Sequence, residues 1–168
     1  MTDVTKYYEL TYDQLELKTE ELYRKIEKDN FVPDTILAIA RGGWFPARIL
    51  SDIYSSKDID VDIVSITTKF YSSIGKTKSR PLLLQHLNQT LFDQRILIVD
   101  DVSDSGTTLK FVKGYSDFMG ARYVKVACPF MKPGTKVIPD YYVEEVPNTT
   151  WIVFPYETRG MQKLKDKK

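Results

Sequence analysis

The sequence predicts an α/β protein built around a doubly wound, mostly parallel sheet. Short continuous apolar runs alternate along the chain with segments of helical periodicity, and strands that are covered on both faces have this appearance. Polar or glycine-rich segments follow several of these runs directly, at the place where open α/β sheets bind ligands. A chain of 168 residues has the usual size of one domain, so we expect a single domain over residues 1–168.

The N-terminal part predicts helices and strands in alternation. A helix is expected from about residue 11 to residue 30, because Thr11 and Gln14 have the spacing of a capping box. The apolar run 35–40 predicts a strand, and the pair of glycines that follows it predicts a turn into a helix over 44–54.

The same alternation continues in the C-terminal part. Further apolar runs predict strands over residues 61–68, 95–99 and 123–127. A helix is expected over 107–119, where Gly120 ends it. The region of about 130–160 is rich in proline and aromatic residues and predicts short strands that form a cap at the edge of the sheet. The lysine-rich tail, about 163–168, is expected to be flexible.

Composition excludes several classes of protein. Lys and Arg number 24 and Asp and Glu 23, and this balance argues against a protein that coats nucleic acid or membrane. A single cysteine excludes a disulfide framework within the chain and a cysteine-based zinc site. The first residues do not form a signal peptide, and no apolar run is long enough to span a membrane. We therefore expect a cytoplasmic protein.

The strongest functional signal is the segment 96–109. Asp100, Asp101 and Asp104 lie between a predicted buried strand and a helix start, where their repulsion needs a cation or a polyhydroxyl ligand to offset it. The next four residues, 105–108, supply hydroxyls and free backbone N–H groups that suit a phosphate monoester. A sugar phosphate would suit both halves of the segment, because its hydroxyls can bind the acids and its phosphate can bind residues 105–108. The alternative is that Asp104 only caps the helix and the other two acids only end the strand.

This segment closely resembles the phosphoribosyl-pyrophosphate (PRPP) motif of the type I phosphoribosyltransferases, a strand that ends in two acids and then Asp-Ser/Thr-Gly-x-Thr. Residues 39–43 resemble the pyrophosphate loop of that family, and residues 69–80 resemble its flexible loop. The purine-recognition segments of the hypoxanthine–guanine and xanthine–guanine members are similar to residues 130–133, 139–142 and 151–154. The resemblance implies the type I phosphoribosyltransferase fold, with a small hood from the C-terminal region that recognises the base.

The resemblance also implies an activity. The protein would be a purine salvage glycosyltransferase (a pentosyltransferase) that uses Mg²⁺ and transfers the 5-phosphoribosyl group from PRPP to hypoxanthine or guanine, with xanthine as a further candidate, releasing pyrophosphate. Its partners would be PRPP, a purine base and a second copy of the chain in a homodimer. Two alternatives stay open: a regulatory protein that senses PRPP or a nucleotide without turnover, and a transferase for adenine or a pyrimidine.

Roles at the ribose follow from the same resemblance. Asp100 and Asp101 would bind the ribose hydroxyls and Mg²⁺, and Glu157 would bind a second Mg²⁺. Asp104 would exchange a proton with N7 of the purine as a general acid and base. The residues that would surround the 5′-phosphate are Ser105, Gly106, Thr107 and Thr108.

Roles at the leaving group and the base are assigned in the same way. Arg41, Gly42 and Lys69 would bind pyrophosphate, and the Ala40–Arg41 peptide bond is the candidate for the cis bond that members of the family often carry here. The remaining cationic and aromatic candidates of the flexible loop are Tyr71, Lys76, Lys78 and Arg80. Lys132 would donate a hydrogen bond to O6 of the base, which favours a 6-oxopurine over adenine. Trp151 would stack on the purine, and the backbone carbonyl of Ile152 would accept its N–H groups.

Overall fold

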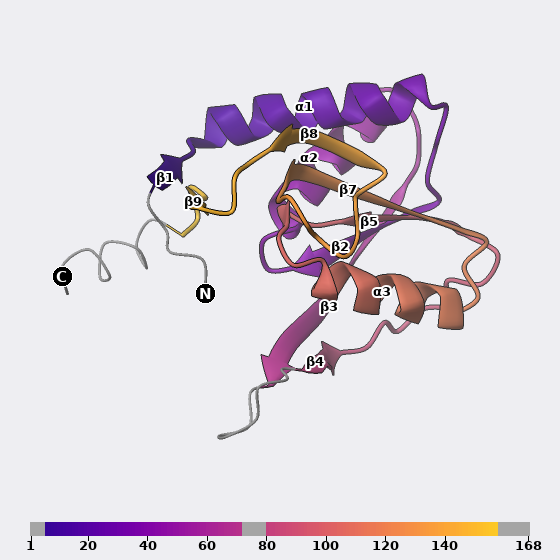
Figure 1. The fold of residues 1–168 in the computed structure, drawn as a ribbon. Helices are drawn as coiled ribbons and strands as arrows, with labels where there is room; N and C mark the ends of the chain where they lie inside the picture. The colour runs from indigo at the N-terminus through magenta and orange to yellow at the C-terminus, as the bar shows by residue number, and fades with distance from the viewer. Residues whose placement is uncertain (1–5, 72–79, 158–168) are drawn as a thin grey trace.

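The computed structural model describes residues 6–71 and 80–157, and in them helices cover both faces of a central sheet. The helices are α1 (Tyr12–Lys28), α2 (Trp44–Ser55) and α3 (Thr107–Phe118). Figure 1 shows α1 along one side of the sheet and α3 along the other, and α2 packs beside α1 on the same face. None of the helices in this described part is both long and apolar enough to cross a membrane.

The central sheet of the described residues has seven strands, and all their pairings are parallel except that of β3 with β4. The strands are β2 (Thr35–Ala40), β3 (Asp62–Tyr71), β4 (Arg80–Gln85), β5 (Arg95–Val99), β6 (Val102–Ser103), β7 (Tyr123–Met131) and β8 (Tyr141–Glu145). Their order is β4-β3-β2-β5-β7, with β6 and β8 both paired to β7. The predicted doubly wound, mostly parallel architecture is therefore confirmed.

Alternating side chains of the buried strands create a core on each face of the sheet. On β2, Ile36 and Ala38 pack in the cluster that includes Leu22 and Leu50 of α1 and α2. Leu37 and Ile39 of β2 pack in the second cluster, together with Leu109 and Val112 of α3. Burial on both faces explains why this strand reads as a continuous apolar run rather than as an alternating one.

The predicted element boundaries agree closely with the structure at several positions. Thr11 caps α1 as expected: its Oγ1 accepts a hydrogen bond from the backbone N of Gln14 at 3.2 Å, and the Gln14 side chain accepts one from the backbone N of Thr11 at 2.9 Å. The predicted strands over 35–40 and 95–99 match β2 and β5.

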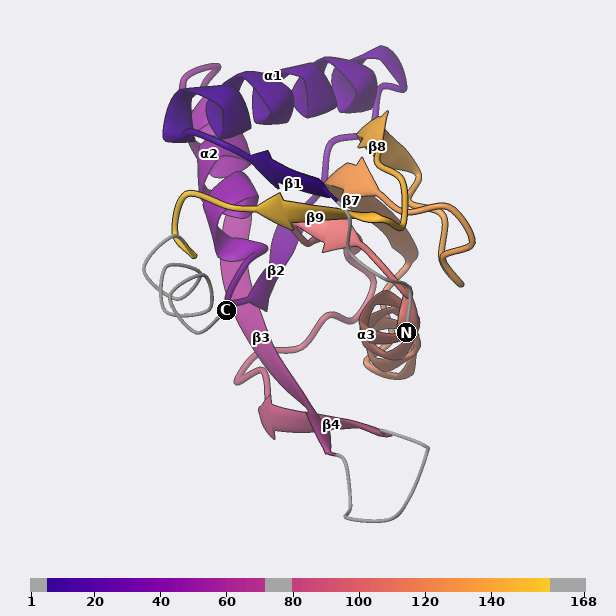
Figure 2. The same ribbon diagram turned by 60° about the vertical axis from the view of Figure 1, so that its left-hand side comes forward.

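The prediction that the strands after residue 129 form a cap is only partly correct. Strand β8 belongs to the central sheet, where it continues the parallel ladder of β7 with Ala127 opposite Tyr141. Of the two described strands that begin after residue 129, β9 (Thr150–Val153) lies outside the central sheet. It pairs in parallel with β1 (Lys6–Glu9), a strand that the sequence did not indicate. Figure 2 shows this β1–β9 pair beside the carboxyl end of β7. Both errors concern pairings between distant segments, which local patterns do not encode.

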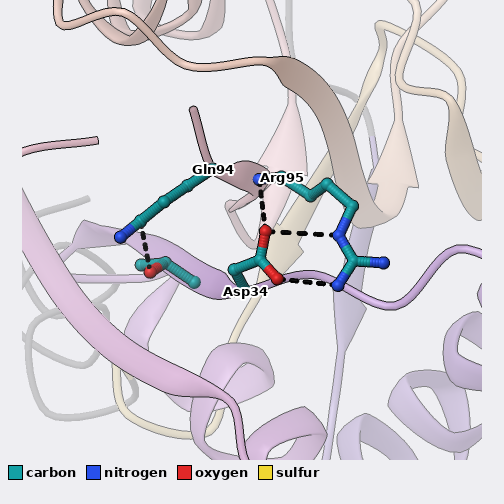
Figure 3. Close-up of polar contacts among 4 residues, drawn as sticks. Asp34, Gln94 and Arg95 are labelled. Atoms are coloured by element: carbon teal, nitrogen blue, oxygen red, sulfur yellow. Dashed lines mark hydrogen bonds and ion pairs between the residues drawn. The ribbon is translucent and has the colours of Figure 1, made fainter. Parts of the chain in front are cut away.

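An ion pair fixes the amino ends of the two central strands. Asp34 precedes β2, and its carboxylate accepts hydrogen bonds from the guanidinium of Arg95 at 2.7 and 3.2 Å and from the Arg95 backbone N at 2.7 Å (Figure 3). Thr35 Oγ1 donates to the side chain of Gln94 at 2.9 Å in the same view. The Arg95 hydrogen bonds hold the pKa of Asp34 below its ordinary value. These contacts align β2 with β5, so that the segments following both strands emerge at the same edge.

Candidate functional site

The acidic pair follows β5 at the carboxyl edge of the sheet. The backbone N of Asp101 donates to Asp100 Oδ1 at 3.0 Å, which orients the Asp100 carboxylate, and the two acidic side chains also interact with each other. Burial, and then the charge of Asp101, raise the pKa of Asp100 well above its ordinary value. Burial also raises the pKa of Asp101, although a hydrogen bond from Tyr156 opposes this. A bound cation or a donor-rich ligand would relieve the repulsion between these groups.

The predicted pyrophosphate loop packs directly against this acidic pair. A Cβ atom on Gly42 would lie 1.9 Å from Asp101 Oδ2, and one on Gly43 would lie 2.8 Å from Asp100 Cα. Only glycine allows the two segments to approach so closely. The peptide bond between Ala40 and Arg41 is cis, as predicted. Two motifs separated by more than fifty residues in sequence thus form one surface.

The turn before α3 has the form of a phosphate-binding turn. Gly106 adopts a left-handed conformation with φ of 69°, and a Cβ there would lie 2.5 Å from Thr135 Oγ1. Ser105 Oγ donates to Thr107 Oγ1 at 3.1 Å. Because Gly106 is the N-cap and no side chain in the described part of the chain, Asp104 included, caps α3, the alternative that Asp104 serves only as a helix cap is wrong.

A lysine that the sequence analysis missed lies at the same turn. Lys136 Nζ donates to Thr107 Oγ1 at 3.2 Å, and the Lys136 backbone N donates to the carbonyl of Ser105 at 3.1 Å. Its position close behind Lys132 in a Pro-Gly turn could have drawn attention to it, but only the fold brings that turn to the start of α3. The site therefore offers a cation beside the hydroxyls, in addition to the backbone amides.

A pocket of about 530 Å³ joins the acidic loop to the C-terminal segment. Its lining consists of Asp101, Val102, Asp104, Lys132, Asn148, Thr150, Trp151, Ile152, Phe154 and Glu157. Trp151 is 47% exposed although it lies in a strand, so its ring is available to a ligand. The predicted general acid and base and all three predicted base-binding residues thus line one cavity.

Lys132 is positioned by backbone carbonyls at the wall of this pocket. The residue is only 7% exposed, and its Nζ donates to the carbonyl of Pro147 at 2.9 Å and to that of Thr150. Burial lowers the pKa of Lys132, and the charge of Asp104 acts in the opposite direction. An ammonium has three N–H donors, so two carbonyls leave one donor for a ligand.

Glu157 lies within electrostatic reach of both Asp101 and Arg41. Burial and the charge of Asp101 raise the pKa of Glu157, while the charge of Arg41 lowers it. Within residues 6–71 and 80–157, however, no group of three or more His, Cys, Asp or Glu side chains is close enough to hold a metal ion. The predicted set Asp100, Asp101 and Glu157 is therefore not a complete metal site by itself.

The adjacent carboxylates nevertheless fit Mg²⁺ that arrives with a phosphorylated substrate. Magnesium in such sites is held by one or two carboxylates together with substrate phosphates, and it keeps several of its waters. Asp100 and Asp101 supply that number of carboxylates, and their mutual repulsion favours a divalent cation between them and a ligand.

Other predicted residues are not brought to this pocket. Lys69 is exposed on β3 opposite Leu82 of β4, and no ion pair of the described residues joins it to the acidic pair. The predicted flexible loop, residues 69–80, begins and ends in β3 and β4, and its positions 72–79 fall outside the described residues. The predicted tail at 163–168 also falls outside them.

Comparison with known proteins gives one consistent result. The family described as "Phosphoribosyl transferase domain" matches residues 10–159. The chain is 30% identical over 152 residues to the xanthine-guanine phosphoribosyltransferase of Gluconobacter oxydans, an alignment that covers 90% of this chain and 85% of that protein. It is 28% identical over 154 residues to the protein of the same name from Desulfotalea psychrophila, covering 91% of this chain and 88% of that one.

Solved structures agree with these sequence relatives. A purine phosphoribosyltransferase from Pyrococcus horikoshii superimposes with a TM-score of 0.78 and 38% identity, covering 90% of this chain and 95% of that one. The Helicobacter pylori xanthine-guanine-hypoxanthine phosphoribosyltransferase has the same fold, with a TM-score of 0.72 at 21% identity, covering 95% of this chain and 99% of that one.

Proposed function

Because this chain belongs to the phosphoribosyltransferase family, we propose that it transfers the 5-phosphoribosyl group from PRPP to a 6-oxopurine and releases pyrophosphate. The observation that carries this proposal is the convergence of the acidic pair, the phosphate-binding turn and a base-sized pocket at one edge of the sheet. The relatives named above act on purines, as the sequence resemblance predicted.

The acids act at the ribose. Asp100 and Asp101 hold its hydroxyls next to the anomeric carbon, where positive charge develops as the bond to pyrophosphate breaks. Their negative charge stabilises this oxocarbenium-like transition state because it is in place before the reaction begins. Mg²⁺, held by these carboxylates and the substrate oxygens, would neutralise charge on the departing pyrophosphate.

Asp104 moves the proton of the base. It is exposed and lines the pocket together with Lys132 and Trp151, where N7 of a purine would lie. As N9 of the base attacks the anomeric carbon, the ring system would gain positive charge, and Asp104 accepts the proton carried by N7. Hydrogen-bond reach to that atom is the geometric requirement for this role.

Selection among bases falls to Lys132, Trp151 and Ile152. The fixed ammonium of Lys132 can donate its free N–H to a carbonyl at C6. In adenine an amino group, itself a donor, stands at C6, so neither the Lys132 N–H nor the amino group would find an acceptor there. The Trp151 ring stacks on the purine, and the Ile152 carbonyl accepts its N–H groups. Hypoxanthine, guanine and xanthine share the C6 carbonyl that this arrangement reads.

Turnover assays test this function. The protein is mixed with PRPP and Mg²⁺ and, in turn, with hypoxanthine, guanine, xanthine and adenine, while nucleotide formation is followed. We expect formation of the nucleotide from at least one 6-oxopurine and much slower reaction with adenine. Tight PRPP or nucleotide binding without turnover of any base would instead identify a sensor, and preferred turnover of adenine would contradict the assignment of Lys132.

The expected homodimer is tested by analytical sedimentation of the purified protein. The cytoplasmic location also stays a prediction.

A further inference from the structure

Tyr156 lies where the pyrophosphate loop, the acidic pair and the segment after β9 meet. It belongs to none of the sequence motifs, and the proposed mechanism gives it no role. Its ring is stacked between Phe45, with ring centroids 4.2 Å apart and planes 9° apart, and Phe154, at 5.3 Å and 7°. Phe45 belongs to the first turn of α2, directly after the pyrophosphate loop, and Phe154 follows the base-binding strand β9. The stack therefore fixes the ring from both sides and leaves it little freedom to turn.

The hydroxyl of this fixed ring is directed at the acidic pair. Tyr156 Oη donates to Asp101 Oδ2 at 2.7 Å and lies 3.5 Å from the carbonyl oxygen of Gly42. A hydroxyl has one proton, and the shorter contact to a charged acceptor is the stronger hydrogen bond. The same Oδ2 is the atom that lies against Gly42, so the phenol restrains the carboxylate at its contact with the pyrophosphate loop.

We infer that Tyr156 is a positioning residue that holds the Asp101 carboxylate in the orientation required for binding Mg²⁺–PRPP, an inference that rests on the proposed function. Without the hydroxyl, Asp101 can rotate about its side-chain torsions, and part of the binding energy of PRPP must be used to order it. The residues proposed to bind the base, Trp151, Ile152 and Lys132, take no part in this hydrogen bond, so we expect purine binding to change less than PRPP binding.

The test compares Tyr156→Phe with Tyr54→Phe. The first variant keeps the aromatic stack and removes only the hydroxyl at Asp101. The second removes a buried hydroxyl that has no hydrogen-bond partner among the described residues, at the end of α2 and away from the site. Binding of Mg²⁺–PRPP is measured by calorimetry without any purine, so the readout does not require turnover.

We expect Tyr156→Phe to raise the Kd of Mg²⁺–PRPP by about tenfold, the effect of losing one hydrogen bond to a charged group. Where the enzyme turns over, the KM for PRPP should rise in parallel and the KM for hypoxanthine should change less than about twofold. Tyr54→Phe should leave both constants at their wild-type values. In an Asp101→Ala background, which removes the acceptor of the Tyr156 hydroxyl, the added Tyr156→Phe change should alter the Kd by less than about twofold, because the two residues act as one unit.

Three results would overturn the inference: a Kd for Tyr156→Phe within twofold of wild type, an undiminished effect in the Asp101→Ala background, or an equal rise in the KM of the purine. A wild-type protein that turns over no base would contradict the proposed function alone, since the calorimetric comparison would still report on Tyr156.

Discussion

The side chain of Asp104 illustrates how a single residue acquires its role from its surroundings. Its neighbours Asp100 and Asp101 are partly buried beside Gly42 and Gly43, whereas Asp104 is exposed at the pocket. Burial raises the pKa values of the first two carboxyls. Three acids from one short segment thus divide into a pair suited to ribose and metal and one suited to proton transfer.

Replacing Asp104 by Asn should separate chemistry from binding. The amide keeps the shape of the side chain but cannot take up a proton, so kcat should fall by about 100-fold or more, while the affinity for PRPP should change little. Steady-state kinetics and PRPP calorimetry measure the two effects. Asp117→Asn, an exposed change on α3, is the control. Equal loss of kcat and of PRPP affinity would contradict the proton-transfer role.

Lys132 and Lys136 form a matched pair at the two ends of one turn. Lys132→Ala should lower kcat/KM for hypoxanthine and guanine by about tenfold or more, because a buried donor to O6 is lost, while kcat/KM for adenine should fall much less.

Lys136→Ala should raise the KM for PRPP several-fold, on the order expected for one charge-assisted hydrogen bond, and leave the order of preference among bases unchanged. Measuring both variants with all four bases checks both assignments. Similar losses with adenine and hypoxanthine in Lys132→Ala would remove the basis for the O6 contact.

The strand starts show how elements are held in register. Asp34 ties the beginning of β2 to Arg95 of β5 through two guanidinium contacts and one backbone N–H (Figure 3). Because both strands lead directly into site segments, this contact at the opposite edge of the sheet helps to align the pyrophosphate loop with the acidic pair.

The Asp34 pair makes the stability of the protein depend on pH. The pKa of Asp34 is lower in the folded state, so its contribution is present above the ordinary aspartate pKa and is lost as the pH falls through the folded value. Since both side chains are about 40% exposed, solvent screening limits the loss of unfolding free energy in Asp34→Asn to about 1 kcal/mol at pH 7. Denaturant unfolding of the variant and the wild type at pH 7 and at acid pH measures this loss, and the difference in unfolding free energy between the two proteins should shrink in acid.

Asp93→Asn provides the matched control for that change. Asp93 forms a similar two-point contact with Arg122, at 2.8 and 3.1 Å, but it is more exposed and accepts no hydrogen bond from the Arg122 backbone. Its replacement should therefore destabilise the protein less than Asp34→Asn. The opposite order would show that the β2–β5 contact does not stabilise the fold as described.

At the scale of the whole molecule, the two ends of the described chain form one structure. Strand β1 pairs with β9, with Tyr7 opposite Trp151, and the apolar side chains Leu10, Phe130 and Ile152 pack together beneath the pair. The base-binding strand is thus supported by the N-terminal strand as well as by the sheet.

Removal of residues 1–9 should weaken purine binding more than PRPP binding. Without β1, the strand β9 loses the partner that the structure shows, and Trp151 and Ile152 lose their fixed positions. The phosphate-binding turn and the acidic pair lie between β5 and α3 rather than on β9, so the KM for PRPP should change much less than the KM for hypoxanthine. Parallel kinetics of the truncated and full-length proteins check this. A larger change in the KM for PRPP would show that β1 supports the sheet edge rather than the base pocket.

The sequence by itself determined the features that depend on neighbouring residues. Helix α1 with its capping box, the buried strands β2 and β5, and the acid–glycine–hydroxyl order of the PRPP motif are all local patterns. Together with the resemblance to known transferases, they were sufficient for the fold class and the family, both of which are confirmed.

Tertiary structure decided which distant groups meet. The pairing of β1 with β9, the place of β8 in the central sheet, the approach of Lys136 to Thr107 and the contact of Tyr156 with Asp101 all join segments far apart in the chain. Such contacts arise from burial and packing of the complete core, and a short stretch of sequence carries no record of the partner that it will find.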